Sequence, residues 1–140
     1  MIPYKAINIS QLNEIGRNTL AQHLAMEVTS VGEDYITMRM PVNSNVHQPL
    51  GMLHGGAVAA LAENVASLAG NLVVNSQGKA CLGLSLNTNH LKSARDGYVY
   101  ATARPIHLGR STQVWEVETK NEEDALLNVC RMTLAVVDRT

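Results

Sequence analysis

The sequence of 140 residues lacks the features of several specialised classes of protein. Its formal net charge is only −1, which argues against a nucleic-acid partner, because nucleic-acid binders present strongly basic surfaces. Its two cysteines, Cys81 and Cys130, lie in apolar runs, so we expect buried free thiols rather than a disulfide. We see no signal sequence, and no stretch approaches the ~20 apolar residues of a membrane span. We therefore expect a soluble cytoplasmic protein with no membrane partner.

Several motifs of metal, serine and nucleotide sites are also absent. The histidines and cysteines show no ligand spacing such as H-x₃-H or C-x₂-C, so we expect no metal. The segment GLSLN at 83–87 is not the G-x-S-x-G turn that carries a nucleophilic serine. Neither G-x-G-x-x-G nor a GK[ST] phosphate loop occurs. The sequence therefore supports no mechanism of these types, and we expect no cofactor.

The apolar content of 46% is sufficient for the core of one domain over residues 1–140. Hydrophobic periodicity predicts a short helix, a hairpin, one long helix and four further strands. The predicted ranges are 10–24, with Ser10 as N-cap and Leu12, Ile15 and Leu20 near one face; 25–32 and 34–42; 55–74; and 80–92, 97–106, 111–120 and 126–137. Short turns between the last four strands imply antiparallel pairing, and a single long helix must cover one sheet face. The sequence thus predicts an α+β fold.

The long predicted helix is nearly apolar all round and rich in small residues. These small residues are Ala57, Ala59, Ala60, Ala62, Ala66, Ala69 and Gly70. A helix of this kind is enclosed rather than lying on a surface. Because one small domain cannot easily enclose the helix and also bind a ligand, we expect at least a homodimer.

Glu63 is the only acidic residue of this helix. An ionised carboxylate among apolar residues costs several kcal/mol unless it is paired, so a structural Glu63 would face solvent or an arginine. Ser67 lies four residues on, on the same helix face, where its hydroxyl can hold a water or donate to the carboxylate. Acids with perturbed pKa values are typical of functional sites, which makes Glu63 a catalytic candidate.

The start of the helix, Gly55-Gly56, is a candidate binding site for a carbonyl oxygen. The first amides of a helix have no internal partner, and the helix dipole adds a partial positive charge. Glycine lets a ligand approach the backbone closely, although a tight helix start is the better explanation of the pair taken alone. Gln48 and His54 flank this point; either could hydrogen-bond a ligand, and His54 could instead support the loop.

Gly55 and Glu63 are eight residues apart, which is about 12 Å along a helix axis. One small reacting group cannot touch both residues of the same chain. If both act on the same atom, they come from two chains packed about a twofold axis, and the site lies at the dimer interface.

The charges are unevenly distributed along the sequence. Residues 79–111 contain five basic residues and one acidic residue, whereas the rest of the chain is net negative. This basic region on a near-neutral protein suits a small anionic ligand better than a polyanion, although its cations could also simply solvate the strands.

Three segments together resemble the hotdog-fold acyl-CoA thioesterases. They are HQPLGMLHGGAVAALAENVAS at 47–67, NTNHLKSARDG at 87–97 and RPIHLGRSTQVWEVE at 104–118. Within the family, the resemblance is strongest to the group of 1,4-dihydroxy-2-naphthoyl-CoA hydrolases of menaquinone synthesis and the proofreading thioesterases of enterobactin synthesis. It implies an antiparallel sheet wrapped around one central helix, and homodimers that usually pair into tetramers. The implied activity is hydrolysis of acyl-CoA.

The resemblance also implies roles for individual residues. Glu63 would attack the thioester carbonyl or activate water, the Gly55 N–H would polarise the carbonyl, Gln48 and His54 would orient it, and Ser67 would assist Glu63. The implied coenzyme A contacts are Asn89, His90, Leu91, Lys92, Ile106, His107, Leu108, Gly109, Arg110 and Ser111. These contacts overlap the basic region. Within that region we also name Arg95 and Arg110 as our own candidates for phosphate ligands.

The sequence departs from the family at Leu50, where an aromatic residue is usual, and it contains no Phe. Two other functions are compatible with the motif. A hotdog dehydratase would act on hydroxyacyl thioesters with an acid and a histidine, and a non-catalytic acyl-CoA-binding protein would sense its ligand without hydrolysing it. Release of a free thiol from acyl-CoA distinguishes hydrolysis from both.

Overall fold

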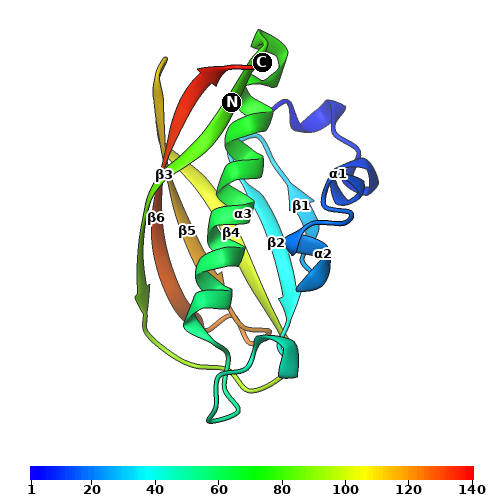
Figure 1. Cartoon of the computed structure of the whole chain (residues 1–140), viewed down its shortest axis with the longest axis vertical. Coiled ribbons are helices and arrows are strands. Elements are labelled where there is room, and N and C mark those ends of the chain that lie inside the picture. Colours follow the sequence, from blue (N-terminus) through cyan, green and yellow to red (C-terminus); the bar gives the residue numbers. More distant parts are fainter.

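The computed structural model describes all 140 residues, and its central feature is a six-stranded antiparallel sheet curved around one long helix (Figure 1). The helices are α1 (Ile9–Ile15), α2 (Leu20–His23) and α3 (Gly55–Val74), and the strands are β1 (Glu27–Val31), β2 (Ile36–Pro41), β3 (Lys79–His90), β4 (Tyr98–Leu108), β5 (Thr112–Lys120) and β6 (Leu126–Asp138). The strand order is β1-β2-β4-β5-β6-β3. The predicted α+β architecture is confirmed, with α3 matching its predicted range.

The predicted helix over 10–24 is wrong. The segment forms α1 and α2, separated by a turn in which Asn18 has a φ of 61°, a left-handed conformation that ends a helix. Asn8 rather than Ser10 caps α1, since its side chain accepts from the N–H groups of Ser10 and Gln11. The expected shared face is also wrong, because Ile15 and Leu20 are 68% and 59% exposed.

Helix α3 lies against the inner face of the sheet. At Gly70 an added Cβ would lie 2.5 Å from Leu134 Cδ1, so the absence of a side chain permits this close approach. Trp115, Leu134 and the face of β2 that includes Ile36 and Met40 are buried in the core beneath it. Residues 55–77 are long and apolar enough to cross a membrane, contrary to our expectation that no stretch would be. In this fold they form the core helix.

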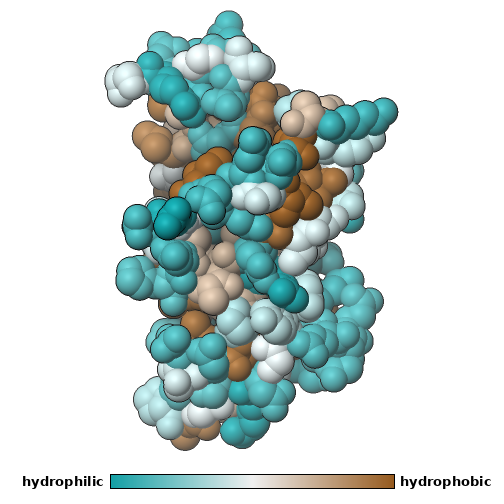
Figure 2. All heavy atoms as spheres, turned by 90° about the vertical axis from the view of Figure 1, so that its right-hand side faces the viewer, coloured by the Kyte–Doolittle hydropathy of each residue, from teal (hydrophilic) through white to brown (hydrophobic).

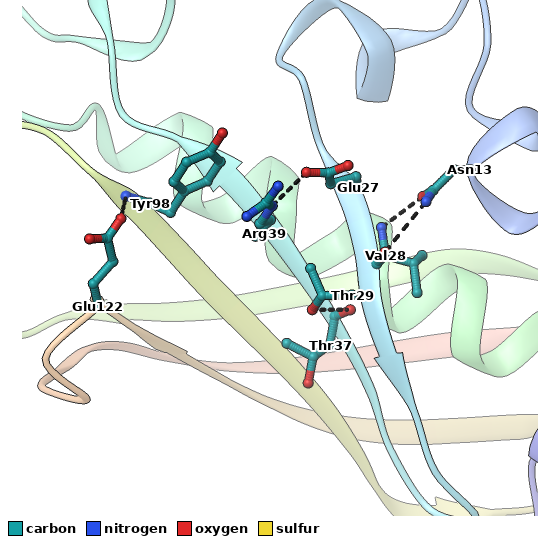
Figure 3. A network of polar contacts seen from close by, with 8 residues as sticks. All are labelled: Asn13, Glu27, Val28, Thr29, Thr37, Arg39, Tyr98 and Glu122. Carbon is teal, nitrogen blue, oxygen red and sulfur yellow. Dashed lines mark hydrogen bonds and ion pairs between the residues drawn. The ribbon is translucent and has the colours of Figure 1, made fainter. Parts of the chain in front are cut away.

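The β1 edge of the sheet is short and held by side chains from neighbouring elements. Asn13 of α1 accepts from the Val28 N–H at 2.7 Å, and Arg39 of β2 pairs with Glu27 (Figure 3). A bulge interrupts the strand between Val28 and Ser30. On this side of the molecule, hydrophobic patches are broken up by hydrophilic side chains (Figure 2).

The β3 edge is different. Strand β3 has twelve residues and pairs only with β6, so its other side carries backbone groups with no neighbouring strand. Leu82 and Leu84 on this strand are 60% and 62% exposed. Cys81 and Cys130 are buried free thiols, as expected, and burial raises the pKa of both.

Candidate active site

The first turn of α3 is built by the loop that precedes it. His54 is the N-cap, and its Nδ1 accepts a hydrogen bond from the Gly56 N–H at 2.8 Å. The His54 N–H donates to the Val46 carbonyl, which fixes the entry of the chain into the helix. Neutral His54 therefore carries its proton on Nε2, on an exposed side chain. His54 therefore supports the loop, which is the structural role that we considered, and its Nε2–H remains free to donate.

The Gly55 N–H donates to no group of the chain, so the helix start offers an unoccupied backbone donor with the dipole behind it. The ring of His90, from the end of β3, lies against this glycine: an added Cβ at Gly55 would be 2.7 Å from His90 Nε2. A side chain at this position would force the His90 ring to shift, so glycine permits the close approach of the ring to the helix start.

Gln48 lies beside this helix start with its amide already oriented. Its Oε1 accepts from the N–H groups of Leu50 and Met52, at 2.5 and 3.4 Å, which leaves the Nε2 hydrogens free to donate. Gln48, Gly55 and His90 line one open pocket of ≈ 360 Å³, together with Leu53, Val58, Leu91, Lys92, Ser93, Leu127 and Asn128. The pocket thus combines several hydrogen-bond donors with one cation.

Glu63 lies further along α3, beside the free edge of the sheet. Its carboxylate makes no ion pair or hydrogen bond within the chain, and its Oε2 would be 3.3 Å from a Cβ added to Gly83 of β3. Glu63 is exposed in the single chain, as expected for a structural glutamate that faces solvent rather than an arginine. Ser67 is half-buried one turn on and does not bond to Glu63. A single chain therefore presents the acid at one place and the donors at another.

The two candidate coenzyme A segments are also separated. His90 pairs with Asn128 at one end of the sheet, whereas the β4–β5 turn at 109–111 lies beside Val136 at the other (Figure 1). Through the registers of β5 with β6 and of β6 with β3, this turn is level with Leu82 of β3. Leu82 is eight residues, or roughly 26 Å, from His90 along that strand. Within a single chain, the segments Asn89–Lys92 and Ile106–Ser111 therefore lie at opposite ends of the sheet.

The basic region is not continuous either. Lys79 pairs with Asp138 at 2.7 Å, and Arg104 lies 3.5 Å from Asp34. Arg95 reaches the Leu50 carbonyl at 3.5 Å and so supports the loop before α3. Lys92 remains free at the pocket and Arg110 at the opposite end of the sheet. Two of the five cations are thus neutralised, and the others lie at both ends of the molecule.

Asn128 is a polar residue of this pocket that sequence reasoning missed. It occupies the buried face of β6 and is 1% exposed. The only signal in the sequence is a single polar residue within the apolar run LLNVC at 126–130. No three histidine, cysteine, aspartate or glutamate side chains come together as a metal site would require.

Comparison with known proteins gives consistent results. A sequence profile of the thioesterase superfamily matches residues 50–128. The crystal structure of a thioesterase from Haemophilus influenzae superposes with a TM-score of 0.94 at 43% identity, covering 99% of this chain and 96% of that one. A glutamine-to-alanine variant of a thioesterase from Pseudomonas aeruginosa gives 0.92 at 39% identity, with 94% and 95% covered.

A third relative is a thioesterase from Staphylococcus aureus, solved as a glutamine-to-alanine variant. It gives a TM-score of 0.81 at 39% identity, with 84% of this chain and 98% of that one covered. A further structure of the same protein carries a glutamate-to-alanine substitution. In that protein the substituted glutamine and glutamate are fifteen residues apart, the same spacing as between Gln48 and Glu63.

Proposed function

This chain belongs to the thioesterase superfamily, and we propose that it hydrolyses acyl-coenzyme A thioesters to a free carboxylic acid and coenzyme A. The observation that carries the proposal is the set of oriented, unpartnered groups on one helix and its loop. The Gly55 N–H and the Gln48 amide are free donors, and Glu63 is a free carboxylate. The shared fifteen-residue spacing of substituted glutamine and glutamate in the Staphylococcus relative supports the same pair here.

In the proposed reaction, Glu63 either takes a proton from the water that attacks the thioester carbonyl carbon, or attacks that carbon itself to form a mixed anhydride that water then hydrolyses. The Gly55 N–H and Gln48 amide stabilise the oxyanion, and each such donor is typically worth about 2.7–4 kcal/mol in the transition state. Collapse of the tetrahedral species breaks the C–S bond, and the thiolate leaves and takes up a proton. Single-turnover hydrolysis in ¹⁸O-water separates the two roles, because only nucleophilic attack places label in the protein.

We propose that the working unit is a homodimer formed by antiparallel pairing of two β3 edges. Antiparallel pairing brings the His90 end of one strand towards the Lys79 end of the other. It would therefore bring one chain's Gly55 and Lys92 towards its partner's Glu63 and β4–β5 turn, uniting groups that one chain keeps apart. Arg110 would then contribute to the same coenzyme A site as Lys92. Pairing of such dimers into tetramers is a further proposal that sedimentation can test.

For the acyl group we propose an aromatic ring system such as 1,4-dihydroxy-2-naphthoyl, because the 47–67 motif is most similar to that group of thioesterases. Hydrolysis rates over matched aromatic, short aliphatic and long aliphatic CoA esters test this. Preference for an aliphatic ester would contradict the aromatic proposal while leaving hydrolysis intact. That outcome would fit Leu50, which replaces the usual aromatic and is 72% exposed.

The decisive experiment is Glu63→Gln, which keeps the shape of the side chain and removes its charge. We expect kcat to fall by about 100-fold or more, because general-base catalysis typically contributes 10²–10⁴-fold, while acyl-CoA binding persists. The control is Glu123→Gln, on an exposed turn where the side chain has no partner. Thiol release is followed with a colour reagent. Full activity in Glu63→Gln refutes the assignment, and binding without thiol release by the wild-type protein favours a sensor or a dehydratase.

A further inference from the structure

A row of polar side chains crosses from β6 to β3 at the end of the sheet nearest the start of α3. Asn128 and His90 are direct neighbours in the β3–β6 register, as are Cys130 and Thr88. Asn128 Nδ2 lies 2.8 Å from Thr88 Oγ1 and 2.9 Å from His90 Nδ1, and the Cys130 thiol donates to Asn128 Oδ1 at 2.9 Å. Every hydrogen-bonding group of this buried amide thus has a partner, which is what burial of a polar group requires.

The network fixes which nitrogen of His90 carries the proton. Burial raises the pKa of the Cys130 thiol, so the sulfur stays protonated and its hydrogen faces an acceptor, Asn128 Oδ1. The Nδ2 group then has two hydrogens, one for Thr88 Oγ1 and one for His90 Nδ1. Because Nδ1 accepts, neutral His90 carries its hydrogen on Nε2.

The Nε2 edge of His90 faces the start of α3. It is the closest group to the position of a Gly55 Cβ, at 2.7 Å, and both residues line the pocket that also contains Gln48. The Gly55 N–H in the same pocket has no partner in the chain. Two N–H donors, one from the backbone and one from an imidazole, therefore lie at the same helix start.

We propose that Asn128 is a positioning residue that holds neutral His90 with its Nε2–H directed at the helix start, where His90 and Gly55 donate together to the thioester oxygen. This inference rests on the proposed hydrolysis and gives His90 a role beyond the coenzyme A contact that the family resemblance implies. His90 transfers no proton in this role. Its hydrogen bond strengthens as negative charge develops on the oxygen.

The first test needs no substrate. Long-range ¹H–¹⁵N correlation spectra of the wild-type protein report which ring nitrogen of each neutral histidine is protonated, and His90→Gln identifies the His90 signals by their loss. We expect the Nε2–H form for His90. An Nδ1–H form overturns the proposal. If the wild-type protein hydrolyses no thioester, the proposed function fails, and the spectra still decide which tautomer of His90 the fold holds.

The second test is the pH profile of Asn128→Asp. The carboxylate of Asn128→Asp can only accept hydrogen bonds, so neutral His90 must place its hydrogen on Nδ1. Its Nε2 then turns a lone pair, rather than a hydrogen, towards the substrate oxygen. The imidazolium form of His90 still donates from Nε2. The kcat of this variant should therefore decrease at alkaline pH relative to the kcat of the wild type. Asn8→Asp, which makes the same charge change at the exposed cap of α1, should keep the wild-type profile. Identical profiles for both variants and the wild type refute the positioning role.

Substitution of His90 itself completes the test. His90→Gln keeps an N–H donor near the position of Nε2 and should retain kcat within about tenfold, whereas His90→Leu should lose about 100-fold, the typical effect of removing one oxyanion donor. Equal activity of His90→Leu and the wild type overturns the proposal, even if Asn128→Asp fails to fold.

Discussion

The two edges of the sheet are built in opposite ways, although both end the same sheet. At the β1 edge, a strand of five residues is bulged, capped by Asn13 from α1 and crossed by the Glu27–Arg39 pair (Figure 3). At the β3 edge, twelve residues have no covering element and Leu82 and Leu84 are exposed, and the one irregularity is a register shift between Gly83 and Ser85. Edges that stay free are kept short, charged or covered, whereas a long uncovered edge with exposed apolar side chains is a template for another strand. This contrast is what we expect if β1 faces solvent and β3 pairs with a second copy of the chain, as we propose.

The largest effect should come from charging the β3 edge. Leu84→Lys places an ammonium group on the surface that we propose to be shared, where it would be buried without a partner. We expect the dimer to dissociate into folded monomers and thioester hydrolysis to be lost, because Glu63 and Gly55 of different chains separate. Sedimentation velocity measures the first effect and thiol release the second.

The matched control is Thr29→Lys on the β1 edge, where the side chain is exposed. It should change neither the assembly nor the rate. A Leu84→Lys protein that remains dimeric and active would show that β3 is not the dimer interface, and an effect of equal size from Thr29→Lys would remove the distinction between the edges.

The sequence predicted the strands and the helix more reliably than their spatial relations. Alternating residues such as Ile36, Met38 and Met40 identify a buried strand face, and the small residues of α3 identify a core helix, since both depend on local periodicity. The N-terminal helix failed because the left-handed turn at Asn18 outweighed a weak apolar pattern. The separation of the two coenzyme A segments depends on register, which no local pattern encodes.

The same distinction applies to the candidate site. The motif around Gly55 and Glu63 stands out in the sequence as an acid within an apolar helix and a glycine pair at its start. Asn128 does not, because its importance lies in a cross-strand contact with His90, thirty-eight residues away. Which edge of the sheet stays unpaired also depends on strand order, so the contrast between β1 and β3 needed the fold.

An intermediate effect is expected from removing the hydrogen bond between Asn13 and Val28 of β1. Asn13→Ala leaves the N–H of buried Val28 without its acceptor, and an unsatisfied buried donor typically costs about 1–3 kcal/mol of unfolding free energy. Urea unfolding measures this loss, and we expect the oligomeric state and the hydrolysis rate to stay as in the wild type. Asn13→Asp keeps the acceptor and should lose less. If Asn13→Ala instead altered the assembly, the β1 edge would not be the closed edge that its structure indicates.

The smallest effect concerns the ion pair at the first residue of β3. Lys79 donates a hydrogen bond to Asp138 at 2.7 Å, which holds the pKa of that carboxyl below its ordinary value. A lowered folded-state pKa means that the pair contributes stability above the ordinary pKa of aspartate, and that this contribution disappears as pH falls through the lowered value. Lys79→Met should therefore be slightly less stable than the wild type near pH 7 and equal to it in strong acid. Exposed pairs contribute little, so the difference in urea midpoint should be close to the resolution of the measurement. A difference that grows towards acid pH would contradict the assigned direction, and a large one at pH 7 would mean that this end of β3 is buried in the assembly.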